Sequence, residues 1–502
     1  MLLKLQNGTD VRGIAAPGVP GEDVNFVPAD ANRISQAFVI WLSKKTGIPA
    51  AQLTIGVGHD SRITAEMLKE AILKGLTAQG AKAVDCHLAS TPSMFMSTVY
   101  DEFKYNGSIM ITASHLPFHR NGMKFFDVEG GLEHDDITDI LNIAEGLSEA
   151  EGDCCTIEEA DLISSYSAHL CDKIRAGVNS ADCYEEPLRG LKIVVDAGNG
   201  AGGFFVEKVL KPLGADTTGS QFLEPDGMFP NHIPNPENKQ AMEAIRQAVL
   251  ANEADLGIIF DTDVDRMSAV LPDGSEINRD AIIAMMAAIL ADEYPGSTVV
   301  TDSVTSDRLQ DFLENHLGMK QHRFKRGYKN VINECKRLNE SGIVSPLAIE
   351  TSGHGALKEN YYLDDGAYMA VKLLISAAKA NKAGKKVGSY VEALKPGFEE
   401  IEIRMKISGE DFGTYGKEAL KIFEERALAR GMKVAPNSYE GIRISFDTEE
   451  IKGWLLLRMS LHEPLMPLNI EGVRPGDCDR MKAVAAELLD GFDRIDRSKL
   501  MK

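Results

Sequence analysis

Three segments of this 502-residue chain repeat one plan: an apolar run rich in β-branched residues, a polar loop, and then apolar residues at helical spacing. The runs and loops are "LTIGVGHDSR" (residues 53–62), "LKIVVDAGNGAGG" (191–203) and "STVVTDSVTSD" (297–307). Apolar strands that alternate with helices predict sheets covered on both faces, with parallel pairing. The pattern predicts an α/β protein with three related domains whose sheets are mixed and mainly parallel.

The pattern changes after about residue 400. The short alternating runs "EIEIRMKI", "GIRISF" and "GWLLLRMSL" are typical of strands with one buried face. We therefore expect a smaller C-terminal α+β domain with an antiparallel sheet. Linker-like stretches at residues 176–190 and 379–389 help to place the boundaries. The predicted domains are residues 1–187, 188–295, 296–398 and 399–502.

The net charge of −21, from 75 acidic and 54 basic residues, argues against nucleic acid or an anionic membrane surface as a partner. Seven cysteines without a C-x-x-C pair suggest neither a disulfide framework nor a zinc site. The N-terminus lacks a signal-like apolar core, and the longest apolar run, residues 281–291, is too short to cross a bilayer. We expect a cytoplasmic protein, either a monomer or a homodimer.

"GIIFDTDVDR" places Asp261, Asp263 and Asp265 directly after an apolar strand. Alternate residues of an extended segment point the same way, so the three carboxylates can converge on one point. Their mutual repulsion in a partly buried site favours a hard divalent cation, and Mg²⁺ suits oxygen ligands best. The sequence therefore predicts a Mg²⁺ site on this loop.

Two other kinds of site have a similar acidic loop. A calcium-binding EF-hand needs Gly at its sixth and Glu at its twelfth position, where this chain has Arg266 and Pro272. A haloacid-dehalogenase-type phosphatase has D-x-D-x-T or D-x-D-x-V after a strand, but Asp265 stands at the T/V position. The calcium interpretation fails, and the phosphatase interpretation stays open.

"GNGAGG" (residues 198–203) formally matches the G-x-G-x-x-G pattern of dinucleotide-binding loops. The strand before it ends in Asp196, whose charge would oppose a pyrophosphate, and the motif lies in the middle of the chain. We interpret these glycines as a tight turn.

"IMITASHLP" (residues 109–117) places Ser114 at the end of a predicted strand, where α/β proteins carry their chemistry. Taken alone, the serine fits a turn or helix cap at least as well. Cationic groups follow it, and Asn121-Gly122 predicts a hairpin that folds the chain back toward the serine. The cationic side chains are those of His115, His119, Arg120 and Lys124.

Two more cationic clusters and one polar turn point to an anionic ligand, because arginine and hydroxyl groups on loops suit phosphate. Carboxylate, hydroxyl and imidazole groups together also suit sugar hydroxyls. The clusters are Lys325, Arg326 and Lys329 around Gly327, and Arg458, Ser460 and His462; the polar turn "ETSGHG" holds Glu350, Ser352 and His354.

Together these stretches resemble the α-D-phosphohexomutase family, which includes phosphoglucomutases, phosphomannomutases and phosphoglucosamine mutases. The resemblance runs nearly end to end and in the family's order. Its motifs are "NGTDVRG", "VGHDSR", "MITASHLPFHRNGMKFF", "DAGNGAG", "PDGMFPNHIPNPE", "DTDVDR", "RGYKN", "ETSGH" and "RMSLHEP".

The resemblance implies a four-domain mutase that interconverts hexose 1-phosphate and hexose 6-phosphate. Phosphorylated Ser114 would complete the Mg²⁺ site of the three aspartates, and a hexose 1,6-bisphosphate would serve as bound intermediate and activator. Arg12 and Lys124 would lie beside the transferring phosphate, with Lys124 or His115 exchanging the proton. The resemblance assigns substrate binding to Glu350, Ser352, His354, Gly327, Lys329 and Arg266, and phosphate binding to Arg458, Ser460 and His462.

Three positions depart from the family pattern: Leu116 replaces Asn in T-A-S-H-N-P, Thr262 and Val264 replace glycines of the metal loop, and His462 replaces Thr. We expect glucose and mannose phosphates as the substrates, and a phosphoglucosamine mutase is an alternative. A sugar-phosphate phosphatase and a non-catalytic hexose-phosphate-binding protein are the rival hypotheses.

Overall fold

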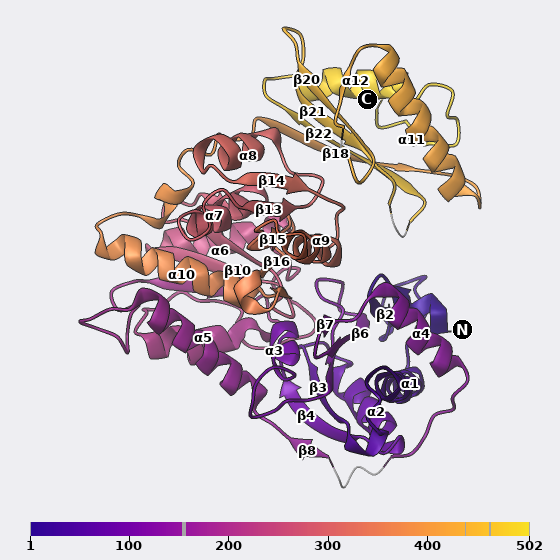
Figure 1. The fold of residues 1–502 in the computed structure, drawn as a ribbon, viewed down its shortest axis with the longest axis vertical. Helices are drawn as coiled ribbons and strands as arrows, with labels where there is room; N and C mark the ends of the chain where they lie inside the picture. The colour runs from indigo at the N-terminus through magenta and orange to yellow at the C-terminus, as the bar shows by residue number, and fades with distance from the viewer. Residues whose placement is uncertain (1, 153–156, 437, 461–462, 501–502) are drawn as a thin grey trace. The chain divides into compact units, whose positions relative to one another are not determined.

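The computed structural model describes residues 2–152, 157–436, 438–460 and 463–500. The chain divides into two compact units. The first comprises Met1–Asn278 and Ser352–Ser389, and the second comprises Arg279–Thr351 and Tyr390–Lys502. Figure 1 draws the start of the first unit in indigo and purple and the end of the second in yellow.

The first unit contains most of the helices and strands. Its strands are β1 (Gln6–Asn7), β2 (Asp10–Ile14), β3 (Thr54–His59), β4 (Lys82–Leu88), β5 (Gly107–Ile111), β6 (Arg120–Asp127), β7 (Gly130–Gly131), β8 (Glu158–Glu159), β9 (Ile193–Asp196), β10 (Leu256–Phe260), β11 (Met267–Val270), β12 (Glu276–Ile277), β16 (Gly355–Leu357) and β17 (Leu363–Asp364). Its helices are α1 (Pro28–Thr46), α2 (Ala65–Ala78), α3 (Thr91–Met96), α4 (His134–Glu145), α5 (Leu162–Val178), α6 (Lys239–Asn252) and α10 (Gly366–Lys382).

An eight-stranded sheet, counted over the described residues, organises the N-terminal part of this unit in the order β1-β2-β6-β5-β3-β4-β8, with β7 beside β6. Strand β3 is parallel to β4 and β5, whereas β6 is antiparallel to β5 and β2. Ile55 and Val57 of β3 pack into the core shared with α1 and α2, while Gly58 faces Met94 of α3. Helices therefore cover both faces of this sheet (Figure 1).

A second, mixed sheet of the first unit has the order β12-β11-β10-β9. Strands β9 and β10 are parallel, and the other two pairs are antiparallel. Helix α6 packs on β9 and β10, and α10 contacts α5, β10 and β11. Strand β10 is buried throughout and ends directly before Asp261, so the sheet fixes where the predicted metal loop begins.

The second unit contains two kinds of sheet. Its elements are α7 (Asp280–Ala291), β13 (Thr298–Thr301), α8 (Asp307–Asp311), β14 (Lys320–Arg323), α9 (Tyr328–Glu340), β15 (Leu347–Ile349), β18 (Glu399–Lys406), α11 (Phe412–Ala429), β19 (Lys433–Val434), β20 (Ile442–Asp447), β21 (Lys452–Leu457), β22 (Leu465–Gly472) and α12 (Asp477–Leu488). Strand β13 is parallel to both β14 and β15, and α9 packs on β13 and β15.

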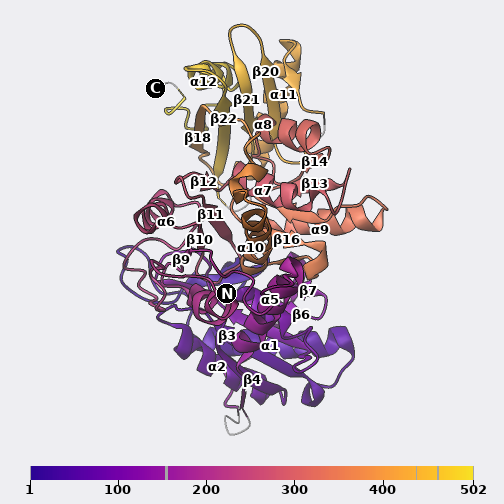
Figure 2. The same cartoon turned by 90° about the vertical axis from the view of Figure 1, so that its left-hand side faces the viewer.

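The C-terminal sheet is antiparallel throughout, in the order β18-β22-β21-β20-β19. Figure 2 shows β20, β21 and β22 side by side. Leu455 and Leu457 of β21 face the core shared with α11 and α12, whereas Trp454 and Leu456 pack with Val304 on the opposite face. This alternation is the period-two pattern that the sequence predicts.

The predicted fold class is confirmed: α/β units with mixed sheets precede an α+β part with an antiparallel sheet. The boundaries of the four domains stay a prediction. The hairpin predicted at Asn121-Gly122 is wrong, because both residues lie inside β6 and the chain turns earlier, between β5 and β6. Within the described part of the chain, no helix combines the length and apolarity needed to span a membrane.

Candidate active site

Ser114 lies in the loop between β5 and β6, at a strand end as predicted. Its side chain is buried, and its φ of +51° lies in the left-handed region that non-glycine residues rarely adopt. The Thr112 hydroxyl accepts a hydrogen bond from the Ser114 amide at 2.8 Å, and Thr112 in turn donates to Asp60 at 2.7 Å. The surrounding loop therefore holds the serine in an uncommon backbone conformation.

Arg62 fastens this loop from the neighbouring strand end. Its guanidinium donates to the backbone carbonyls of Ser114, Leu116, Pro117 and Arg120, the last three at 2.6, 2.9 and 2.8 Å. The side chain is fully buried, with its Nε 3.3 Å from the equally buried carboxylate of Asp60. One arginine thus neutralises a buried charge and satisfies four loop carbonyls.

Asp261, Asp263 and Asp265 converge as predicted, since their carboxylate oxygens lie within 4.8 Å of one another and all three residues are buried. Ser114 Oγ donates to Asp261 Oδ2 at 3.1 Å. The structure therefore brings together all four oxygen-bearing residues assigned to the metal site.

The backbone of this metal loop is held by close contacts with neighbouring glycines. Val264 has a φ of +67°, so it adopts the left-handed conformation although it is β-branched. A Cβ on Gly200 would lie 2.6 Å from the Thr262 carbonyl oxygen, and a Cβ on Gly366 would lie 2.6 Å from the Arg266 carbonyl. The glycine at position 200 of the "GNGAGG" motif thus allows a close approach to the metal loop.

Lys124 on β6 supplies a cation to the cluster. Its ammonium donates to Asp263 Oδ2 at 3.0 Å and to Asp265 Oδ2. Burial, followed by the charges of Asp265 and Asp263, raises the pKa of Asp261 well above its ordinary value. The three carboxylates therefore repel one another more than Lys124 alone compensates.

The three aspartates fit a divalent metal ion. Asp263 Oδ1 and Asp265 Oδ1 are buried without a hydrogen-bond partner among the described residues, so two oxygens remain to bind a cation. Carboxylate and hydroxyl oxygens are the donors that Mg²⁺ prefers.

His115 lies beside the serine, with its Nδ1 3.2 Å from Ser114 Oγ. The positive charge of Arg266, followed by burial and the charges of Arg12 and His354, holds the pKa of His115 well below its ordinary value. The neutral imidazole can therefore accept a proton from the serine hydroxyl.

Arg12 and Arg266 flank the same region. Arg12 lies on β2, opposite Gly122 of β6, and donates to Asp10 at 2.8 Å. The Arg266 amide donates to Asp261 Oδ1 at 3.2 Å, and its guanidinium Nε lies 3.8 Å from Asp261 Oδ2.

His354 and Ser352 belong to the first unit with the aspartates. His354 Nδ1 lies 2.5 Å from Asp364 Oδ2 and 3.7 Å from Asp265 Oδ1. Their turn is fixed to β11, since the Gly353 carbonyl accepts a hydrogen bond from the Met267 amide at 3.1 Å. Burial, followed by the charge of Asp265, raises the pKa of Asp364 well above its ordinary value.

The other predicted substrate residues lie in the second unit. The Gly327 amide donates to Glu350 Oε1 at 2.6 Å, so the structure brings these two residues together. Gly327 has a φ of +112°, which a residue with a side chain would rarely adopt, and Lys329 follows it in the first turn of α9.

Arg458 and Ser460 also lie in this unit, directly after β21. Arg458 is buried, with its Nη1 3.3 Å from Glu440 Oε1. Glu440 Oε2 accepts hydrogen bonds from the Ser303 hydroxyl at 2.7 Å and the Arg326 amide at 2.9 Å. His462 lies outside the described residues.

Sequence reasoning missed four residues that hold these groups in place: Arg62, Thr91, Asp364 and Glu440. Thr91 donates to Asp263 Oδ2 at 2.5 Å across 172 residues of sequence. Arg62 belongs to the quoted motif "VGHDSR", but nothing local indicates that it reaches the serine loop. These contacts depend on tertiary packing, which local patterns do not encode.

Three family models match this chain. They are described as phosphoglucomutase/phosphomannomutase, alpha/beta/alpha domains I, II and III, and they match residues 4–151, 169–274 and 278–396. The chain belongs to the phosphoglucomutase/phosphomannomutase family of α-D-phosphohexomutases. Members of this family are enzymes, and the recognised resemblance is confirmed.

Curated relatives agree with this assignment over most of their length. The chain is 30% identical to the phosphoglucomutase/phosphomannomutase of Thermococcus kodakarensis over 473 residues, or 93% of this chain and 94% of the relative. It is 27% identical to the phosphomannomutase/phosphoglucomutase of Pseudomonas putida over 450 residues, or 88% and 89%. A crystal structure of a family protein from Burkholderia thailandensis shares the fold, with a TM-score of 0.77, 24% identity and coverage of 96% of this chain and 97% of that chain.

Mg²⁺ should stabilise the wild-type protein through the aspartate triad, and Asp263→Asn should remove this effect. A ligand that binds only the native state stabilises it by about 2.7 kcal/mol at a hundredfold excess over its Kd. The measurement is thermal unfolding with added Mg²⁺ and with a chelator. Asp127→Asn is the matched control, because Asp127 is also buried but pairs with Lys45 at 2.6 Å outside the triad. A full Mg²⁺ shift in Asp263→Asn would contradict the site.

Replacing Arg62 should damage both stability and turnover. Arg62→Met leaves the buried Asp60 without its partner, a loss of roughly 3–5 kcal/mol in the free energy of unfolding. Arg62→Lys keeps the charge but cannot reach four carbonyls, so kcat should fall more than stability does. The measurements are denaturant unfolding and steady-state kinetics.

Arg33→Lys is the control for the Arg62 variants, because Arg33 donates to the Ala144 carbonyl at 3.1 Å, away from the serine loop. It should change stability without changing kcat. A wild-type kcat in Arg62→Lys would show that the hydrogen bonds from Arg62 to the loop carbonyls do not position the serine.

Proposed function

We propose that this protein interconverts hexose 1-phosphate and hexose 6-phosphate, with glucose and mannose as the sugars. The observation that carries the proposal is the position of the Ser114 hydroxyl, 3.1 Å from Asp261 in a buried aspartate triad that also binds Lys124. A hydroxyl placed on a cation-binding cluster is what a phosphoserine mechanism needs. Family membership supports the same reaction.

Ser114 is proposed to carry a phosphoryl group between turnovers. A hydroxyl oxygen of the bound sugar phosphate attacks this phosphorus as the bond to the serine oxygen breaks, which yields a hexose 1,6-bisphosphate. The bisphosphate then reverses its orientation in the site, and its other phosphate is transferred to Ser114 in the reverse step. The net result moves one phosphate between the C1 and C6 positions.

Phosphoryl transfer depends mainly on positioning and on charge stabilisation. Mg²⁺ bound to the three aspartates would supply positive charge beside the transferring group. Lys124 adds a second cation at the same place, because its ammonium contacts both Asp263 and Asp265. Arg12 is proposed to contact the transferring phosphate.

The proton of the serine hydroxyl needs an acceptor when phosphate returns to Ser114. His115 is suited to this role by its position, because its Nδ1 lies 3.2 Å from Ser114 Oγ. When the sugar hydroxyl attacks, the departing serine oxygen takes up a proton again. Lys124 is the alternative proton carrier.

Substrate recognition is proposed by resemblance. Glu350, Ser352 and His354 would hold sugar hydroxyls, with Gly327, Lys329 and Arg266 nearby. Arg458, Ser460 and His462 would bind the phosphate that is not reacting. Support comes from Arg458, which is buried and whose Nε has no hydrogen-bond partner among the described residues, so part of its guanidinium is left for a phosphate.

The experiment measures isomerisation of glucose 1-phosphate and mannose 1-phosphate side by side, with Mg²⁺ and a trace of glucose 1,6-bisphosphate. Free phosphate is followed in the same reactions, and glucosamine 1-phosphate is a third substrate. Formation of a 6-phosphate without phosphate release supports the mutase. Phosphate release without isomerisation would indicate a phosphatase, and no change with any sugar would indicate a binding protein.

In this assay Ser114→Ala should abolish turnover with little loss of stability, since the substitution removes one hydroxyl and keeps the loop contacts of Arg62. Ser97→Ala is the matched control: Ser97 is also buried, and its hydroxyl donates only to the Met94 carbonyl at 2.6 Å. The control should keep its activity. Full activity in Ser114→Ala would overturn the phosphoserine mechanism.

A further inference from the structure

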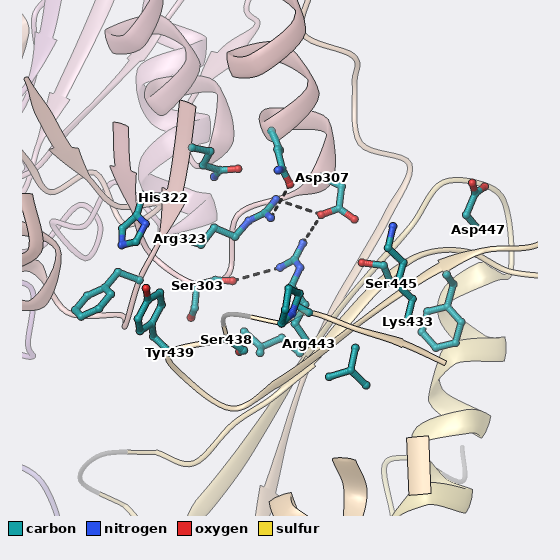
Figure 3. Close-up of a pocket in the computed structure, with 18 residues that line it drawn as sticks. Ser303, Asp307, His322, Arg323, Lys433, Ser438, Tyr439, Arg443, Ser445 and Asp447 are labelled. Atoms are coloured by element: carbon teal, nitrogen blue, oxygen red, sulfur yellow. Dashed lines mark hydrogen bonds and ion pairs between the residues drawn. The ribbon is translucent and has the colours of Figure 1, made fainter. Parts of the chain in front are cut away.

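A cavity of about 620 Å³ lies inside the second unit, and none of its lining residues is assigned to the reaction. Its walls come from two sheet edges: β14, at the edge of the parallel sheet, and β19 with β20, at the edge of the antiparallel sheet (Figure 3). The volume falls in the range of sites that bind small molecules.

Two arginines share one carboxylate in the middle of this cavity. Asp307 Oδ1 accepts a hydrogen bond from Arg323 at 3.1 Å and one from Arg443 at 2.8 Å (Figure 3). The Arg443 side chain is only 6% exposed and lies over the Trp454 ring at 3.8 Å. Asp307 is the carboxylate that both guanidinium groups contact directly. The charges of Asp280, Glu314 and Glu471 also act on them, so the two groups are partly neutralised.

A further cationic side chain lies in the cavity. Lys433 lines the same space, and no ion pair of Lys433 is found within the described ranges. Asp447 is directed to a different partner, Lys452, at 3.2 Å. Burial, followed by the charge of Arg443, lowers the pKa of Arg323 to about 10. An anion would relieve this repulsion, and guanidinium pairs bind phosphate well.

One end of the cavity is aromatic. The rings of Phe324 and Tyr439 lie 4.7 Å apart, and His322 lies 5.4 Å from Tyr439. Tyr439 is 44% exposed, so part of it is accessible to a ligand. Figure 3 shows Tyr439 and His322 on the opposite side of the arginine pair from Lys433.

An unused hydrogen-bond acceptor lies on the same wall. Gln321 lines the cavity, and its Nε2 donates to Thr301 at 3.0 Å and to Thr305 at 2.9 Å. Its Oε1 is buried and has no hydrogen-bond partner among the described residues. A buried acceptor of this kind is costly, and a sugar hydroxyl would satisfy it once the Gln321 side chain turns toward the cavity.

We propose that this cavity binds a nucleoside 5′-monophosphate. Its phosphate would lie against Arg323, Arg443 and Lys433, and its base would stack on Tyr439. A ribose hydroxyl would donate to Gln321. Stacking is the reason to prefer a nucleotide over a sugar phosphate, because three aromatic rings offer flat faces that a base matches. The proposed nucleotide site includes neither Ser114 nor the aspartate triad, so its test is independent of the proposed function.

The test is isothermal titration calorimetry of the full-length protein with AMP and UMP. Ribose 5-phosphate and inorganic phosphate are the comparison probes. We expect AMP to bind more tightly than both. Tyr439→Ala should weaken AMP binding roughly tenfold, through lost stacking, without weakening ribose 5-phosphate. Lys433→Ala should weaken every phosphate-bearing probe.

Two controls test the location of the site. Tyr184→Ala removes a tyrosine of similar exposure, 46%, and Lys406→Ala removes an exposed lysine of β18, both outside the cavity. Neither should change binding. The proposal is overturned if no nucleotide binds at millimolar concentration, if ribose 5-phosphate or phosphate binds as tightly as AMP, or if Tyr439→Ala and Lys433→Ala bind AMP like the wild type.

Discussion

Three aspartate side chains buried within 4.8 Å of one another are the arrangement on which the first unit's chemistry depends. Such a cluster is strongly unfavourable unless cations compensate it. Lys124 provides one positive charge, Arg266 lies 3.8 Å from Asp261, and two carboxylate oxygens are left for a metal. A transferring phosphate is negatively charged and would require the same cations. The groups that stabilise the aspartate cluster in the folded protein would therefore also stabilise the phosphate in the proposed reaction.

The fold also holds the serine loop in a fixed conformation beside these charges. Ser114 adopts a left-handed conformation, and Arg62 binds the carbonyls around it, so the loop is held mainly through its backbone. At position 116, where leucine replaces the family's asparagine, the backbone carbonyl accepts one of these hydrogen bonds from Arg62. Because a backbone carbonyl does not depend on the side chain, this hydrogen bond is kept when leucine replaces asparagine. Val264 likewise adopts the conformation that a glycine would allow.

Helices and strands with a strong hydrophobic periodicity were predictable from the sequence, and so was the convergence of the three aspartates. Strand β10 is an uninterrupted apolar run, and the alternation of Asp261, Asp263 and Asp265 fixes their common direction. The expected helix after the "GNGAGG" loop is a π-helix at Phe205–Leu210 instead, followed by a 3-10 helix that contains Pro212. Asn121-Gly122 misled because both residues satisfy their hydrogen bonds inside a central strand. Arg62 and Glu440 were not predictable, since each acts on loops that are distant in sequence.

The central claim is that Ser114 carries the phosphoryl group, and peptide mapping by mass spectrometry tests it most directly. The protein would be incubated with glucose 1,6-bisphosphate and Mg²⁺, digested, and searched for phosphorylated peptides, with Ser114→Ala treated in parallel. The account predicts one phosphate, on the peptide that contains Ser114, and its loss after addition of excess glucose 1-phosphate. Phosphate on another residue, or an unmodified Ser114 in a protein that still isomerises hexose phosphates, would contradict it.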